Sequence, residues 1–118
     1  MKRQERLKGE TSKHEMCASL YITINVDEKG NPVEVFCNSA KLGTCQALLN
    51  ATSRLVSKLC QLGDLEEAID VCSKIRCPAM QRQMGKITVT KEKDIETVPW
   101  SCPDAIAREL RRYEEKKK

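Results

Sequence analysis

The chain has 118 residues, of which 40% are hydrophobic and only four are aromatic, so it can form one domain with a largely aliphatic core. Its apolar runs are too short to span a membrane and its basic start lacks the apolar stretch of a secretory signal, so we expect a cytoplasmic protein with no membrane partner. The net charge of +4 arises at the ends, because residues 1–8 and 111–118 together hold nine Lys or Arg and three Glu; the slightly acidic remainder disfavours nucleic-acid binding.

A β-hairpin is predicted near the N-terminus. Residues 19–26 (SLYITINV) and residues 33–37 (VEVFC) alternate between apolar and other side chains, which is typical of half-buried strands. The segment DEKGNP between them supplies the turn. Residues 1–13 are interpreted as a basic, flexible N-terminal arm.

Two consecutive helices are predicted after the hairpin. The first ends at Gly63, and the second begins with Asp64 and Glu67 in the spacing of a capping box. The apolar residues that we expect to face the core are Leu48, Leu55, Val56, Leu59 and Leu62 in the first helix and Leu65, Ala68, Ile69, Cys72 and Ile75 in the second.

The rest of the chain is predicted to be a loose segment followed by a C-terminal helix. Pro78 ends the second helix, and residues 85–90 (GKITVT) are compatible with a short strand. Pro103 suits the start of the last helix, with Cys102 as its cap and with Ile106, Leu110 and Tyr113 on its inner face. The sequence therefore predicts an α+β domain.

Seven cysteines are many for this length, and an odd number in a cytoplasmic chain favours metal binding, thiol chemistry or burial over a disulfide scaffold. Packing inside a strand or helix explains Cys37, Cys60 and Cys72. The cysteines at the edges of predicted elements are Cys17, Cys45, Cys77 and Cys102. Four thiolates can hold a tetrahedral zinc ion, but none of these four belongs to a C-x-x-C pair, so four separate buried thiols remain an alternative.

A second alternative is a thiol-redox protein. Cys45 and Cys102 lie at predicted helix N-termini, which favour the thiolate, and either could exchange disulfides with a partner. The resolving cysteine would then be Cys17 or Cys77. His14 lies close to Cys17, but we expect it to be exposed in the N-terminal arm and leave it out of the site.

Four separated motifs resemble one known family. In chain order they are CASLYITINVDEKGNPVEVF, KLGTCQALLNATSRLVSKLCQLG, IRCP and SCPDAIAREL. They resemble the TSCPD domain near the C-terminus of adenosylcobalamin-dependent (class II) ribonucleotide reductases, over residues 14–115, with residues 116–118 as a basic tail. Trp100 stands where the family has threonine, and Ala18 follows Cys17 where the family has glycine.

The resemblance implies a zinc site and an accessory role in deoxyribonucleotide synthesis. The family cysteines fall on the four edge cysteines, which the resemblance makes the ligands of a structural zinc ion. A reductase of this family resembles a ten-stranded barrel with a radical cysteine and a cobalamin site, which 118 residues cannot hold. We therefore expect a non-catalytic module that meets cobalamin only through a partner, such as a reductase catalytic chain; the oligomeric state stays open.

Overall fold

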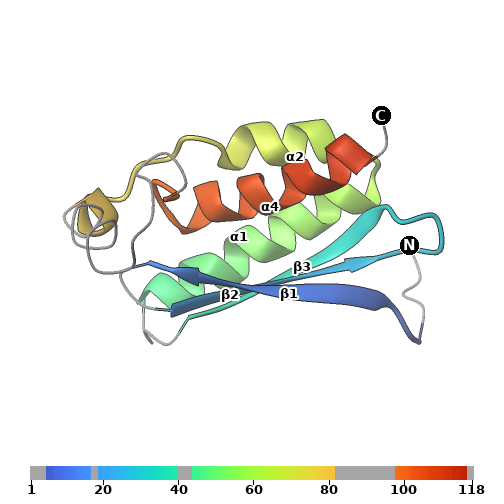
Figure 1. The fold of residues 1–118 in the computed structure, drawn as a ribbon, viewed down its shortest axis with the longest axis horizontal. Helices are drawn as coiled ribbons and strands as arrows, with labels where there is room; N and C mark the ends of the chain where they lie inside the picture. The colour runs from blue at the N-terminus through green and yellow to red at the C-terminus, as the bar shows by residue number, and fades with distance from the viewer. Residues whose placement is uncertain (1–4, 17–18, 40–43, 82–97, 117–118) are drawn as a thin grey trace.

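The computed structural model describes residues 5–16, 19–39, 44–81 and 98–116. They form an α+β fold (Figure 1) whose elements are β1 (Lys8–Glu15), β2 (Ser19–Val26), β3 (Pro32–Ser39), α1 (Thr44–Gln61), α2 (Leu65–Cys72) and α4 (Cys102–Lys116). The predicted class, hairpin, helix pair and C-terminal helix are confirmed, whereas the segment 85–90 lies outside the described residues. None of the helices in the described ranges is long and apolar enough to cross a membrane.

The sheet is antiparallel, with strand order β1-β2-β3. The predicted hairpin forms β2 and β3, with Ile22 opposite Cys37. β1 is an addition, because residues 8–13, assigned to a flexible arm from the sequence, pair with β2 and place Ser12 opposite Ile22. Its sequence, KGETSKHE, has no apolar alternation, and backbone pairing at the sheet edge takes the place of that signal.

The hydrophobic core lies between one face of the sheet and the helices. Leu20, Ile22 and Ile24 of β2 point into it and are at most 2% exposed, and Ile106 and Leu110 of α4 are fully buried against them. α1 packs along β3, and α2 packs on α1 and α4. The opposite face of the sheet carries the exposed side chains of Tyr21 and Phe36.

α1 turns a different face to the core than the sequence predicts. Val56 is buried and Leu59 is partly buried as predicted, but Leu48, Leu55 and Leu62 are 64%, 68% and 76% exposed. The residues of α1 that face the core are Leu49, Ser53, Val56 and Cys60. A buried serine and cysteine interrupt the apolar pattern of this face, so the sequence favours the leucines instead.

α2 also departs from prediction at two positions. Ala68, Ile69 and Cys72 are buried as expected, whereas Ile75 is 44% exposed beyond the end of the helix. Asp64 stands at the N-cap, but its side chain makes no capping hydrogen bond.

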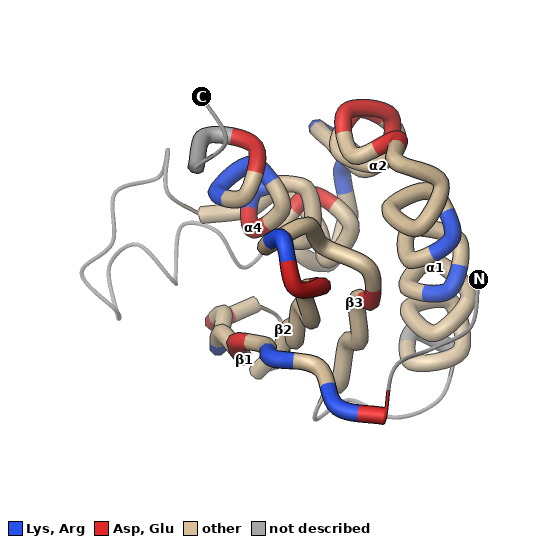
Figure 2. The backbone as a smooth tube through the Cα atoms, turned by 90° about the vertical axis from the view of Figure 1, so that its right-hand side faces the viewer, with Lys and Arg blue, Asp and Glu red and all other residues tan. Residues whose placement is uncertain are grey.

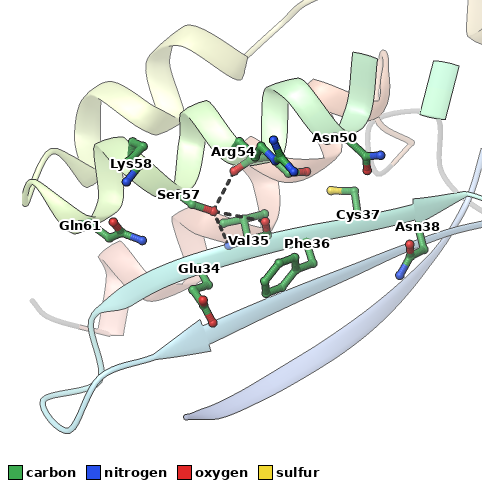
Figure 3. A pocket seen from close by; sticks show the side chains of 11 residues that line it. Glu34, Val35, Phe36, Cys37, Asn38, Asn50, Arg54, Ser57, Lys58 and Gln61 are labelled. Atoms are coloured by element: carbon green, nitrogen blue, oxygen red, sulfur yellow. Dashed lines mark hydrogen bonds between the residues drawn. The ribbon is translucent and has the colours of Figure 1, made fainter. Parts of the chain in front are cut away.

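Polar side chains of α1 occupy the outer edge of β3 (Figure 3). The Val35 N–H donates to Ser57 Oγ at 2.8 Å, and Gln61 Nε2 donates to the Val33 carbonyl at 3.1 Å. Gln46 Nε2 donates to the Cys37 carbonyl at 3.2 Å. These bonds satisfy backbone groups that an edge strand otherwise leaves open, and they fix the rotation of α1 about its own axis.

Candidate metal centre

Two of the four predicted zinc ligands, Cys77 and Cys102, are fully described. Cys17 lies outside the described residues. Cys45 is the second residue of α1, but its side chain is outside the description. The four-thiolate site therefore stays a prediction, of which the structure describes one half.

Cys77 and Cys102 line the same cleft, although 25 positions separate them in the chain. The cleft measures 280 Å³ and is mainly apolar, and both cysteines are partly exposed in it. Its wall also contains Leu48, Leu49 and Thr52, which lie in the first half of α1 and follow Cys45 by one to two turns. Three of the predicted ligands are thus carried by segments that border one cleft.

β1 ends at Glu15, two residues before Cys17, and β2 begins at Ser19, two residues after it. Met16, the residue before Cys17, is 7% exposed and belongs to the same hydrophobic core as Leu49 and Met80. The end of β1, the start of β2 and the starts of α1 and α4 all lie at the left-hand end of the molecule in Figure 1. The topology therefore places the end of β1 and the starts of β2, α1 and α4 at one end of the fold.

Asp104 holds the two described cysteine segments together. Its side chain is 3% exposed, and its carboxylate accepts hydrogen bonds from the Lys74 N–H at 2.8 Å and the Trp100 N–H at 3.0 Å. Arg108 Nε donates to the same carboxylate at 3.1 Å. The Cys77 N–H donates to the Trp100 carbonyl at 3.1 Å, so the chain before Cys77 and the chain before Cys102 form one hydrogen-bonded unit.

The cap of α4 is Ser101, which corrects the prediction that Cys102 caps this helix. Ser101 Oγ accepts a hydrogen bond from the Asp104 N–H at 3.1 Å, and the Ser101 carbonyl accepts one from the Ala105 N–H at 3.0 Å. Cys102 is the first residue of the helix and Pro103 the second. Helix capping therefore does not depend on the Cys102 sulfur, which leaves this position open to a chemical role.

The cysteines assigned to packing are buried in the core, as predicted. Cys37, Cys60 and Cys72 are 3%, 7% and 2% exposed. Desolvation by burial raises the pKa of Cys37, and it raises the pKa of Cys60 and of Cys72 to about 11. These thiols are protonated at neutral pH, which makes them poor nucleophiles.

His14 differs from its predicted exposed state. It lies in β1 with 17% of its side chain exposed, and its Nε2 is 3.2 Å from Glu109 Oε1 of α4 and 3.0 Å from Ser12 Oγ. The hydrogen bond from His14 is the main cause that lowers the pKa of Glu109. His14 thus joins β1 to α4.

Within the described ranges, no three His, Cys, Asp or Glu side chains are arranged to hold a metal ion. Of the predicted set, only Cys77 and Cys102 have described side chains. Two thiols facing one cleft fit half of a tetrahedral zinc site in donor type.

A comparison with protein-family models matches residues 1–114 to the TSCPD domain. The chain belongs to the TSCPD domain family. Comparisons with curated proteins and with solved structures gave no match. In this TSCPD domain Ser101, Cys102, Pro103 and Asp104 reproduce the last four letters of the family name, with Trp100 before them.

The structure gives physical roles to two motif residues that the sequence analysis did not assign. Ser101 caps the helix, and Asp104 joins the segments that carry Cys77 and Cys102. A signal for the cap was present, because serine followed by aspartate three positions later has the spacing of a capping box. The contact between Asp104 and Lys74 has no such signal, since it spans 30 positions.

Proposed function

We propose that this TSCPD domain is a non-catalytic accessory module related to class II ribonucleotide reductase, with a structural zinc ion held by its edge cysteines. The proposed ligands are Cys17, Cys45, Cys77 and Cys102. The observation that carries the proposal is the shared cleft of Cys77 and Cys102, because residues distant in the chain converge there with the chemistry that zinc requires. The family match supports the link to ribonucleotide reductases.

Zinc in this position would add to the hydrogen bonds of Asp104, which already join the segments that carry Cys77 and Cys102. The residues that precede β2 and those that begin α1 and α4 belong to separate parts of the chain, and four bonds to one ion would fix their relative positions. In this proposal the chain itself supplies only folding energy and a rigid surface. The reductase chemistry and the cobalamin belong to a partner catalytic chain in the cytoplasm.

Zinc content tests the site. Protein purified without chelator should contain about one zinc ion per chain, and Cys102→Ser and Cys77→Ser should each lower that content severalfold, because a structural site needs all four ligands. Cys72→Ala is the matched control and should keep its zinc. Wild-type protein without zinc, or unchanged content in both serine variants, would contradict the site.

The accessory role needs a separate measurement. A class II reductase catalytic chain and the zinc-loaded domain should form a complex in analytical ultracentrifugation, and removal of zinc should weaken it. If the domain carries zinc and yet forms no such complex, the site stands and the accessory role fails.

A thiol-redox function is the second candidate, and the same cleft supports it. Cys77 and Cys102 both reach this space, so the two thiols could reduce a partner disulfide to two thiols while they become a disulfide themselves. In the absence of zinc, titration with glutathione buffers followed by mass spectrometry would then give a Cys77–Cys102 disulfide at cytosolic redox potentials. Its absence, together with full zinc occupancy, would exclude this candidate.

A further inference from the structure

Large apolar side chains are exposed together on α1, on α2 and on the segment that follows α2. Seven such side chains are exposed in the described part of the chain, and two of them, Tyr21 and Phe36, lie on the outer face of the sheet. The other five, which we call the hairpin apolar surface, are Leu48, Leu55, Leu62, Val71 and Ile75. Single exposed apolar residues are ordinary, but a group of this kind on one pair of helices is typical of an interface.

These five residues form one surface. Leu48, Leu55 and Leu62 are spaced by seven positions, which places them along one side of α1. Ile75, which follows the end of α2, lines the same cleft as Leu48, and Val71 lies in the last turn of α2. α1 and α2 run in opposite directions on either side of the turn at Gly63. Leu55 and Val71 are equally far from this turn, so they lie at about the same level along the helix pair.

The two helices carry opposite charges beside this surface. Figure 2 shows basic residues on α1, which include Arg54 and Lys58, and acidic residues on α2. The acidic residues of α2 are Glu66, Glu67 and Asp70. All five charged side chains are exposed. Lys58 and Glu67 are also nearly equidistant from the turn, and therefore lie at similar heights on neighbouring helices.

We propose that the hairpin apolar surface binds a second copy of this chain, about a two-fold axis parallel to α1 and α2. Rotation about that axis places α1 of each copy over α2 of the other. It leaves the position of every residue along the axis unchanged. Leu55 then meets Val71 of the second copy, Leu48 approaches Ile75, and Lys58 faces Glu67. The basic and acidic residues lie in separate rows, and only this arrangement brings rows of opposite charge together. A two-fold axis perpendicular to the helices would instead bring basic α1 against basic α1.

The proposed interface adjoins the cysteine cleft. Leu48 and Ile75 belong to both the apolar surface and the cleft wall, so dimer formation would reduce access of solvent to Cys77 and Cys102. The dimer itself does not depend on the proposed function, since it requires only α1, α2 and Ile75, which follows α2.

Sedimentation equilibrium of the full chain tests the dimer. The wild type should have about twice the 13.4 kDa chain mass, and Leu55→Gln should weaken dimerisation by roughly tenfold or more, because it removes a central apolar contact. Phe36→Gln is the matched control, since Phe36 is also exposed but lies on the sheet, and it should leave the dimer unchanged. A monomeric wild type, or a dimer that survives Leu55→Gln, would overturn the proposal. If Leu55→Gln fails to fold by circular dichroism, Val71→Gln replaces it with the same two outcomes.

A charge exchange tests the arrangement of the two copies. Lys58→Glu and Glu67→Lys should each weaken the dimer severalfold, because each creates two like-charge contacts across the interface. The double variant should restore it, since every pair is again of opposite charge. A double variant weaker than both single variants would contradict the two-fold arrangement.

Discussion

The buried carboxylate of Asp104 serves as acceptor for backbone N–H groups from both segments that lead to the described cysteines. Asp104→Asn replaces one accepting oxygen with a donor and removes the charge that Arg108 pairs with. We expect this change to lower the free energy of unfolding by about 3 kcal/mol, since it leaves buried hydrogen-bond donors without a partner. Urea denaturation measures the effect. Glu28→Gln, at an exposed turn position, is the control and should stay within about 0.5 kcal/mol of the wild type; an equal effect in both variants would contradict this role.

Cys72 is a core residue by its burial and its raised pKa. Cys72→Ala removes one sulfur atom from a packed interior and should cost about 1 kcal/mol of stability. Zinc content should not change. A loss of zinc in this variant would mean that the division between packing cysteines and edge cysteines is wrong.

At the scale of single elements, the sequence predicts the strands and helices that have their own apolar period. The alternation in β2 and β3 and the stripe of α4 are confirmed, because their buried residues repeat at the spacing of the element. β1 has no such period, because it lies at the edge of the sheet and joins it through backbone hydrogen bonds with β2. The prediction of the buried face of α1 is wrong because α1 contacts β3 through Ser57, Gln61 and Gln46. In a sequence, polar side chains that bind a strand edge cannot be told from polar side chains on the surface.

The candidate site divides in the same way. The positions of Cys77 and Cys102 at the edges of elements were predictable from Pro78 and Pro103, which mark those edges. Their common cleft was not predictable from spacing, because it depends on the bond between Asp104 and Lys74 and on how α1 packs on β3.

The contact between α1 and β3 predicts a specific loss of stability. Ser57→Ala removes the hydrogen-bond acceptor of the Val35 N–H and should destabilise the domain by about 1–2 kcal/mol. Arg54→Ala introduces the same residue at an exposed position of α1 and controls for helix propensity. Thermal unfolding of both variants measures the difference, and equal midpoints would contradict the proposed role of Ser57.

The contact between β1 and α4 predicts a pH dependence. The hydrogen bond from His14, its charge and the contact with Arg112 lower the pKa of Glu109 in the folded state. The folded pKa lies below the unfolded one, so this contribution is complete above about pH 5 and is lost as the pH falls through the folded pKa. Stability measured from pH 6 to pH 3 should therefore fall less steeply for Glu109→Gln than for the wild type. Parallel curves would show that Glu109 does not contribute.

At the scale of the whole molecule, the fold is asymmetric from end to end. One end holds the end of β1 and the starts of β2, α1 and α4. The other end holds the turn between β2 and β3 and the turn between α1 and α2. We propose that zinc links the chain segments at the first end, whereas short turns link them at the second.

This difference predicts that chelation affects the two ends unequally. Removal of zinc by a strong chelator should speed amide hydrogen exchange at residues 44–49, 77–81 and 101–105, because binding energy at a structural zinc site is folding energy. Exchange in the turn at residues 27–31, where Asp27 accepts two backbone N–H groups, should change much less. Uniform acceleration over the chain would instead indicate global unfolding.

In the proposed zinc site of the TSCPD domain, four cysteine sulfurs bind one zinc ion. X-ray absorption at the zinc edge of the purified protein measures the number and type of ligand atoms directly. We expect a shell of four sulfur atoms at about 2.3 Å. A shell of nitrogen or oxygen atoms at about 2.0–2.1 Å, or one with fewer than four sulfur atoms, would contradict it.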